Sequence, residues 1–229
     1  MANVIVTGAN RGIGLEFCRQ FLERGDHVIA ACRKPSSDLE MLGAKGNLQI
    51  EGNIDVSSDN GASMFAERLG NQPIEILVNN AGIMRPESLE KLDIDSIRQQ
   101  FEVNSLGPLR VTRALLANLE AGARSGLARV AIITSRMGSI ADNTSGGMYG
   151  YRMSKAAVNM AGVSLAHDLK PRKVAVAILH PGYVKTDMTN HGGQIEPSEA
   201  VRGLIARIEA LTLKNTGTFW HQNGEVLPW

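Results

Sequence analysis

Short apolar segments alternate with amphipathic segments along the whole chain of 229 residues. The apolar segments are rich in Val and Ile and are mostly continuous, which is typical of strands buried on both faces of a parallel sheet. They lie at 4–6, 27–32, 48–51, 74–79, 129–134, 173–179 and 218–220. Between them, helical patterns cover 12–24, 57–69, 88–122, 149–169 and 197–212.

This alternation predicts an α/β fold, a Rossmann-type doubly wound parallel sheet of about seven strands with right-handed crossovers. The chain has no repeat, low-complexity tract or linker, so we expect one domain over 1–229. Two long segments, 135–148 and 181–198, follow the predicted strands 129–134 and 173–179. Open α/β sheets bind ligands at the carboxyl ends of their strands, so both segments are candidates for a binding site.

Composition narrows the class of protein. Apolar residues make up 43% of the chain, which excludes a disordered protein, and a net charge of +1 gives no global attraction to nucleic acid or membrane. No apolar segment approaches the roughly 20 residues that span a bilayer, and the first residues, MANVIVTG, are typical of a strand rather than a signal peptide. Cys18 and Cys32 are interpreted as core thiols in a reducing compartment. We therefore expect a cytoplasmic protein.

The segment VIVTGANRGIGLEF runs from the first predicted strand directly into a helix. Gly8, Gly12 and Gly14 fall in the turn, where glycines allow a tight turn and a close approach to a pyrophosphate on the helix N-terminus. The spacing differs from GxGxxG, and the GKS/T of a P-loop is missing. Ordinary loop glycines are the alternative, but the position after the first strand favours a dinucleotide site.

Two cations stand where an NAD-binding protein would carry an acidic residue. About 20 residues after the turn, Asp or Glu would bind the ribose hydroxyls of NAD, whereas an arginine accepts the 2′-phosphate of NADP. Here the second strand is followed by Arg33 and Lys34, and Arg11 lies inside the turn. A solvated basic pair is the alternative. We expect NADP(H) to be preferred over NAD(H).

Tyr151 and Lys155 are four residues apart in a predicted helix and therefore share a face. They are either a surface pair or a phenol held beside a charge so that it can give up a proton. A free tyrosine has a pKa near 10, which a nearby cation lowers toward the working pH. Tyr149, by contrast, is followed at the same spacing by Met153. The nucleotide turn and the upstream TSRMGS favour the catalytic interpretation.

Other catalytic patterns are missing from the sequence. The five histidines form no HExxH, no Cys/His set has zinc spacing, and GxSxG is absent. We therefore predict no metal site and no serine-hydrolase chemistry. His180 precedes Pro181 at a strand end and is interpreted as structural.

Four ordered motifs resemble those of the short-chain dehydrogenase/reductase family over essentially the whole chain. They are TGANRGIG at 7–14, NNAG at 79–82, YRMSK at 151–155 and HPGYVKTDM at 180–188. The segments TSRMGSIADN and YGYRMSKAA and the final LPW are similar to the C-factor and sniffer-like carbonyl reductase branch. The resemblance implies an NADP-dependent oxidoreductase that acts on a small carbonyl or secondary alcohol.

The resemblance also implies a role for each matching residue. Tyr151 would be the general acid or base, and Lys155 would contact the nicotinamide ribose and lower the pKa of the tyrosine. Ser135 would bind the substrate oxygen, Asn104 would hold a water that links Lys155 to solvent, and Asp55 would contact the adenine. The implied cofactor-binding residues are Gly8, Asn10, Arg11, Gly12, Ile13, Gly14, Arg33, Asp55, Val56, Asn79, Ala81, Gly82, Tyr151, Lys155, Pro181, Gly182, Val184 and Thr186.

The chain departs from the family pattern in two places. The interval from Ser135 to Tyr151 is a few residues longer than usual, and the segment after Thr186 is short, which suggests a small lid and an open site. In many relatives the helices near 105–122 and 149–169 form dimer faces, so we expect a homodimer or homotetramer.

A second class of function stays open. Proteins of the C-factor type suggest a nucleotide-binding signalling or regulatory protein with little turnover, and a fold does not settle function. The set Asn104, Ser135, Tyr151 and Lys155 favours the enzyme, because a pure sensor would not need it.

Overall fold

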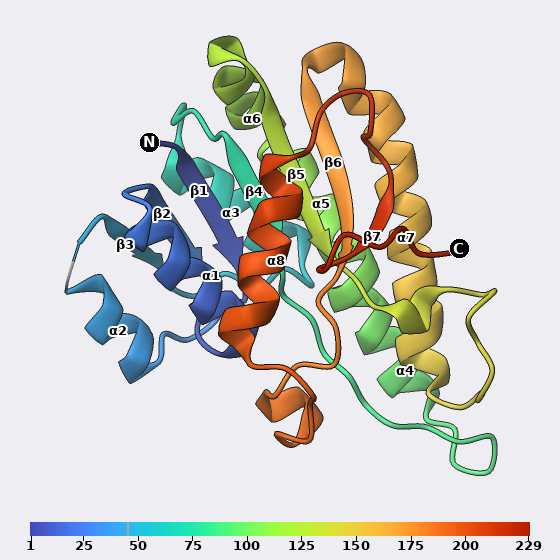
Figure 1. Ribbon diagram of the computed structural model, residues 1–229. Coiled ribbons are helices and arrows are strands. Elements are labelled where there is room, and N and C mark those ends of the chain that lie inside the picture. The colour runs from blue at the N-terminus through green and yellow to red at the C-terminus, as the bar shows by residue number, and fades with distance from the viewer. Residues whose placement is uncertain (45) are drawn as a thin grey trace.

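The computed structural model describes residues 1–44 and 46–229, and its centre is a seven-stranded parallel sheet (Figure 1). The strand order is β3-β2-β1-β4-β5-β6-β7. The predicted doubly wound fold is confirmed, and each predicted strand is present. The strands are β1 Asn3–Thr7, β2 His27–Ala31, β3 Leu48–Glu51, β4 Ile76–Asn79, β5 Ala128–Ile133, β6 Val174–His180 and β7 Phe219–His221.

The helices differ from the prediction in two places. A short helix, α2, forms at Ser37–Gly43, where seven residues with Leu39 alone buried are too few to show a period. The predicted helix 88–122 begins later and is divided, with a π-helical turn at Glu102–Leu106. The others are α1 Gly12–Glu23, α3 Asp59–Leu69, α4 Ile94–Phe101, α5 Gly107–Ala114, α6 Leu116–Gly122, α7 Tyr149–Leu169 and α8 Pro197–Glu209.

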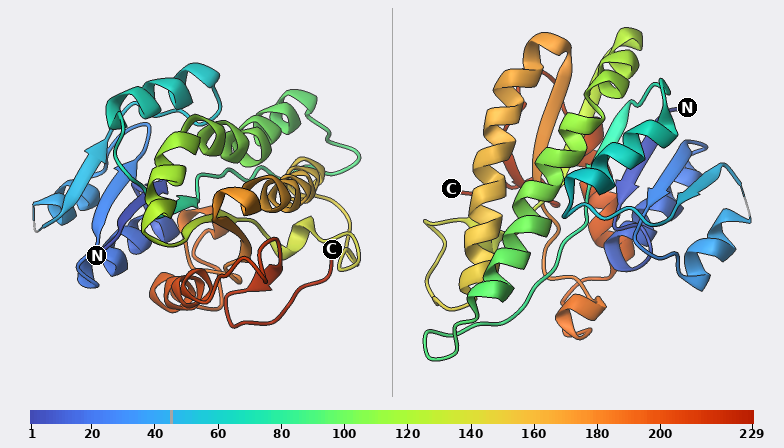
Figure 2. Two further views of the ribbon diagram at one scale, coloured as in Figure 1. Left: turned by 90° about the horizontal axis from the view of Figure 1, so that it is seen from above. Right: turned by 180° about the vertical axis from the view of Figure 1, so that it is seen from behind.

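Helices cover both faces of the sheet, as the view from above in Figure 2 shows. Successive strand residues point to opposite faces. In β1, Val4 and Val6 pack in the apolar cluster that includes residues of α1 and α8, whereas Ile5 packs in the cluster that includes residues of α3 and α7. The strand order reverses between β1 and β4. At such a point the loops diverge and leave a crevice at the carboxyl ends of the strands.

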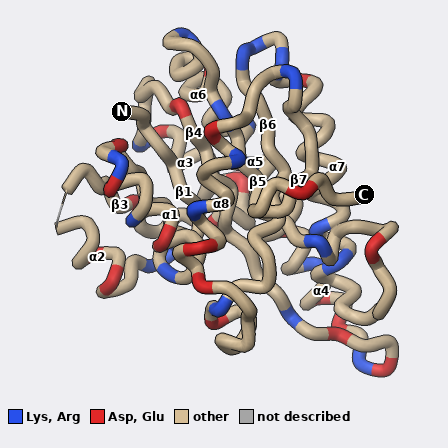
Figure 3. Tube along the Cα trace, in the orientation of Figure 1, with Lys and Arg blue, Asp and Glu red and all other residues tan. Residues whose placement is uncertain are grey.

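Positions occupied by Lys or Arg and by Asp or Glu are interspersed along the trace in Figure 3. This agrees with the net charge of +1. Among the helices that the structure describes, none combines the length and the apolar character needed to cross a bilayer.

Candidate active site

The glycine-rich turn between β1 and α1 depends on glycine at three positions. Gly8 and Gly12 have φ angles of 65° and 53°, which glycine adopts without strain. A Cβ at Gly14 would lie 2.2 Å from the carbonyl oxygen of Gly8, so no larger residue fits there. The turn therefore brings the free N–H groups of the first turn of α1 to the sheet edge, where they can bind an anion.

Two polar residues that the sequence analysis did not assign hold this turn in place. The Thr7 hydroxyl accepts hydrogen bonds from the backbone N–H groups of Asn80 (3.0 Å) and Ala81 (3.1 Å). The Asn80 amide donates to the carbonyls of Thr7 (3.0 Å) and Gly8 (3.3 Å). Both residues lie inside the quoted motifs, and the signal that could have found them is a polar side chain at the ends of two neighbouring strands.

A cavity of about 770 Å³ opens beside the turn. Its walls contain the glycine-rich turn, the ends of the strands and the first turns of α7, and they include most of the predicted cofactor-binding residues. Three of those residues, Asn79, Gly182 and Val184, lie outside the walls. Asn79 is buried and its amide donates to the Thr112 hydroxyl of α5 (3.1 Å), because it points to the opposite face of the sheet.

Arg33 and Asp55 line the cavity where the adenosine end of a dinucleotide is expected. Arg33 is exposed, two residues beyond the end of β2. Burial alone would raise the pKa of Asp55, but hydrogen bonds from the hydroxyl and backbone N–H of Ser57 and the charge of Arg33 lower it overall. Asp55 is therefore an anion at neutral pH, and it interacts electrostatically with Arg33.

Arg11, the cation inside the glycine-rich turn, is paired with a carboxylate. Its guanidinium pairs with Asp187 at 3.2 Å, with side chains that are 70% and 56% exposed. The same carboxylate lies 3.2 Å from the imidazole of His191. Exposed pairs of this kind contribute little free energy and exchange partners readily. Asp187 begins the short 3₁₀ turn after Thr186, so this contact joins the glycine-rich turn to the small segment predicted as a lid.

Tyr151 and Lys155 lie in the first two turns of α7, and both are buried, with 7% and 5% of their surfaces exposed. The surface-pair interpretation is therefore wrong. The Lys155 ammonium donates to the carbonyl of Ile133 (2.9 Å) and lies 5.7 Å from the centre of the Tyr151 ring. Ser135, just beyond the end of β5, lies close enough to the Tyr151 phenol for its hydroxyl to lower the pKa of that phenol. The long interval before α7 thus leaves the two hydroxyls together.

The direction of the tyrosine's pKa differs from the sequence-based prediction. Burial raises the pKa of Tyr151 above its ordinary value, and the Ser135 hydroxyl lowers it only in part. Burial also lowers the pKa of Lys155 to about 8. The physical reason is that the Tyr151 phenolate and the Lys155 ammonium both lose hydration on burial. This cost in free energy exceeds the stabilisation that the neighbouring groups provide.

Lys155→Met should stabilise the fold at pH 7. Because the pKa of Lys155 falls from 10.5 to about 8 on folding, the unfolded chain binds more protons between these values, and stability rises with pH across that window. The cost of burying the charge is fully present below pH 8. At about 1.4 kcal/mol per pH unit, less about 1 kcal/mol for the lost bond to Ile133, we expect a gain of roughly 2 kcal/mol.

Urea denaturation at pH 7 and at pH 10.5 measures this effect. The gain should be present at pH 7 and absent at pH 10.5, where the folded lysine is neutral and little of the burial cost remains. A variant that is no more stable than the wild type at pH 7 would contradict it.

Asn104 lies in the π-helical turn, and both ends of its amide bond to the protein. The amide oxygen accepts from the backbone N–H of Ile83 (2.8 Å), and the amide nitrogen donates to the carbonyl of Ile83 (2.8 Å) and to the Ser154 hydroxyl (3.0 Å). The side chain therefore has a structural task. The amide oxygen keeps one lone pair that the predicted water could use, so the water-binding role stays a prediction.

A profile of the family described as short chain dehydrogenase matches residues 2–196. The chain belongs to the short-chain dehydrogenase family. Among curated relatives of this short-chain dehydrogenase, 1-hydroxy-2-glutathionyl-2-methyl-3-butene dehydrogenase of Rhodococcus sp. (strain AD45) is 42% identical over 235 residues and 100% of both chains. The C-signal protein of Myxococcus xanthus is 43% identical over 166 residues, which cover 72% of this chain and 98% of that protein.

Solved structures of short-chain dehydrogenases extend the similarity to the whole fold. The carbonyl reductase Sniffer of D. melanogaster superposes with a TM-score of 0.93 at 28% identity, over 100% of both chains. The NADPH-bound carbonyl reductase from chicken fatty liver has a TM-score of 0.91 at 31% identity, over 100% of this chain and 99% of that one. The similarity to the C-factor and sniffer-like branch is thereby confirmed.

The residues of this short-chain dehydrogenase fit a nicotinamide dinucleotide. The glycine cradle leaves no room for a Cβ at Gly14, and at Gly82 a Cβ would lie 3.7 Å from the Lys155 ammonium and 3.3 Å from the amide oxygen of Asn104. Arg33 and the buried pair Tyr151–Lys155 line the same cavity. A cation for a phosphate and a proton donor therefore share one space with the phosphate-binding turn.

Proposed function

We propose that this chain is an NADP(H)-dependent oxidoreductase that interconverts a small carbonyl compound and the corresponding alcohol. The observation that carries the proposal is the buried pair Tyr151–Lys155 in a cavity shared with the glycine-rich turn, with the Ser135 hydroxyl beside the Tyr151 phenol. The solved relatives that hold NADPH support the cofactor. We further propose that residues 1–229 work as one domain, and in the cytoplasm, where the buried free thiols of Cys18 and Cys32 suit a reducing compartment.

The protein's own residues orient the substrate and move the proton. The Ser135 and Tyr151 hydroxyls donate to one carbonyl oxygen and stabilise the alkoxide that develops there. Tyr151 then gives its proton to that oxygen, or takes it back in the reverse direction. When bound, NADP(H) supplies or accepts the hydride, and the charge of its oxidised form adds to that of Lys155 in favouring the phenolate.

The raised pKa of Tyr151 suits its role as the acid in the reduction. A phenol whose pKa is raised by burial carries its proton at neutral pH, so it is ready to act as an acid. Lys155, with a pKa of about 8, is still mostly charged at pH 7 and can hold the resulting phenolate. Above pH 8, that support weakens as the ammonium loses its proton.

The test is nicotinamide absorbance with a panel of aldehydes, ketones and alcohols. We include an alcohol that carries a glutathionyl group, because one relative is named for such a substrate. NADPH oxidation that depends on the carbonyl compound supports the proposal. Tight NADPH binding without turnover on any member of the panel would instead favour a sensor, the alternative supported by the similarity to C-signal.

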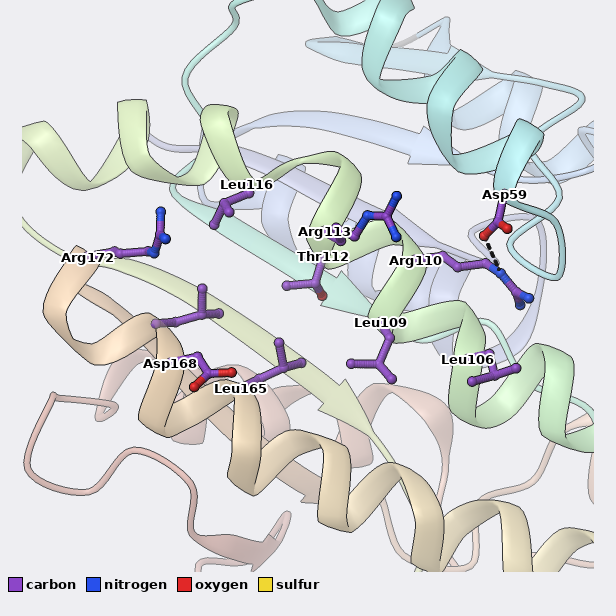
Figure 4. Close-up of a pocket in the computed structure, with 11 residues that line it drawn as sticks. Asp59, Leu106, Leu109, Arg110, Thr112, Arg113, Leu116, Leu165, Asp168 and Arg172 are labelled. Atoms are coloured by element: carbon purple, nitrogen blue, oxygen red, sulfur yellow. Dashed lines mark hydrogen bonds and ion pairs between the residues drawn. The ribbon is translucent and has the colours of Figure 1, made fainter.

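We also propose that the chain forms a homodimer or homotetramer through a groove between α5, α6 and α7. The groove has a volume of about 710 Å³, and Figure 4 shows Leu109, Leu116 and Leu165 lining it between the helices. Arg113 and Asp168 also line it. The apolar floor with charges of both signs suits a self-complementary contact, in which each copy's cation meets the other's anion.

Leu106→Glu should convert the oligomer to a monomer. Leu106 is 38% exposed and lines the groove. A carboxylate there would be buried without a partner in the contact. Light scattering at micromolar concentration measures the mass, and Met41→Glu on α2, at a residue 60% exposed, is the matched control. A monomeric wild type would refute the oligomer.

A further inference from the structure

Glu87 is a buried carboxylate that the proposed reaction does not use. It lies between β4 and α4, and only 7% of it is exposed. One carboxylate oxygen accepts from the Ser96 hydroxyl (3.3 Å) and from the Gln100 amide, and the other accepts from the backbone N–H of Gly150 (3.1 Å). All three donors are uncharged. Burying a carboxylate costs free energy, and neutral donors offset that cost only in part. We therefore expect a role that requires a carboxylate at this position.

The third donor belongs to the helix that carries Tyr151 and Lys155. Gly150 is the second residue of α7, where the backbone N–H groups have no partner within the helix. The N-cap residue, Met148, has a left-handed backbone and an apolar side chain that offers these groups no oxygen. Glu87 supplies the missing acceptor from a position 63 residues away in the sequence, and its negative charge suits the positive end of the helix dipole.

Gly150 itself is required by this contact. A Cβ on Gly150 would lie 2.5 Å from the Gln100 amide nitrogen and 2.9 Å from the Glu87 carboxylate. The backbone of Glu87 also holds the N-cap residue, because its carbonyl accepts from the backbone N–H of Met148 (2.9 Å). The residues directly before Tyr151 are thus held to the segment of Glu87 by side chain and backbone together.

A row of buried polar residues continues the contact along α7. Ser96, Gln100 and Asn104 are four residues apart and hold the segment 83–87 from one side. Gln100 accepts from the backbone N–H of Arg85 (3.1 Å), and Asn104 bonds to Ile83 and to Ser154 of α7. The row, together with Glu87, therefore contacts α7 at Gly150 and at Ser154, on either side of Tyr151 in the sequence.

We propose that Glu87 is a positioning residue that fixes the start of α7 and so holds the Tyr151 phenol beside Ser135. The inference rests on the proposed oxidoreductase function, because Glu87 would act on the reaction through the position of the proton donor Tyr151. A misplacement of about 1 Å can cost about 100-fold in rate, so a helix start that is free to shift would weaken proton transfer. Cofactor binding, which depends mainly on the glycine-rich turn between β1 and α1, would be largely spared.

Glu87→Gln tests this role with little change in shape. The new amide presents N–H₂ to the Gln100 amide, so two donors face each other and the cap at Gly150 is weakened. We expect kcat to fall by about tenfold or more with the KM for NADPH unchanged. Hydrogen exchange followed by mass spectrometry should show faster exchange over 149–155. This second measurement needs no turnover, so it remains informative if no substrate is found and the proposed function fails.

The exchanged pair Glu87→Gln with Gln100→Glu supplies the rescue. It restores one donor facing one acceptor and keeps the net charge, so both kcat and the exchange rate over 149–155 should return toward wild type. Glu90→Gln, at an exposed residue of the same segment, is the matched control and should change neither. Normal exchange and normal kcat in Glu87→Gln would overturn the proposal. If Glu87→Gln does not fold, an exchanged pair that folds but keeps fast exchange over 149–155 would overturn it as well.

Discussion

Tyr151→Phe should lower kcat by about 100- to 10,000-fold, the range that a positioned general acid contributes. The phenylalanine ring fills the same buried place, so packing is retained while the proton donor beside Ser135 is lost. Because the change removes one hydroxyl and no phosphate contact, the Kd for NADPH should be nearly unchanged. Steady-state turnover together with a fluorescence titration of NADPH measures the two effects separately.

Tyr149→Phe is the matched control. Tyr149 begins α7, two residues before Tyr151, and the same hydroxyl is removed there without a partner lysine four residues later. We expect this variant to retain most of its activity. If Tyr151→Phe kept most of its activity too, Tyr151 would not be the proton donor and another acid would have to be sought.

Arg33→Asp should reverse the preference for NADP(H) over NAD(H). Arg33 is exposed on the cavity wall beyond β2, and its guanidinium presents a fork of donors that suits a phosphate. One charge-assisted contact of about 1.5–3 kcal/mol corresponds to a preference of roughly ten- to a hundredfold. The new carboxylate would repel the 2′-phosphate and accept the ribose hydroxyls. It would also stand near the Asp55 anion and raise the pKa of that residue.

The measurement is kcat/KM with both cofactors in the wild type and the variant. Lys34→Asp is the matched control, because Lys34 is an exposed neighbour outside the cavity walls and should leave the ratio almost unchanged. A wild type that used NAD at least as well as NADP, or an Arg33→Asp variant with the same preference, would show that Arg33 is only a solvated cation. The pairing of Arg11 with Asp187 makes Arg33 the better single test.

The strands and the residues of the glycine-rich turn could be predicted because their signals are local. A continuous apolar segment such as the one that became β6 identifies a strand by itself. Gly8 directly follows such a strand, and Gly14 lies in the first turn of the next helix. Tyr151 and Lys155 lie one turn apart in one helix. Each of these patterns spans only a few residues, so it can be recognised in the sequence without knowledge of the tertiary contacts.

Contacts between distant segments could not be predicted in the same way. Glu87 in a polar segment looks like a solvated acid until Gly150, 63 residues later, is brought to it. Asn104 matched the family's water-binding residue, and the fold gives its amide further partners in Ile83 and in Ser154 of α7. Asn79 and Asn80 are neighbours in one motif, but the sheet turns them to opposite sides, and Asn80 alone reaches the cavity.

The sequence by itself determined the order of elements, the parallel sheet, the phosphate-binding turn and the tyrosine–lysine pair, because these depend on periodicity and on spacing within one element. Only the tertiary structure decided the protonation of that pair. From spacing alone, Lys155 should lower the pKa of Tyr151; in the folded protein, burial raises it and lowers the pKa of Lys155 to about 8. The reason is that the loss of hydration depends on all the elements that pack around the two side chains. A local sequence pattern does not contain this information.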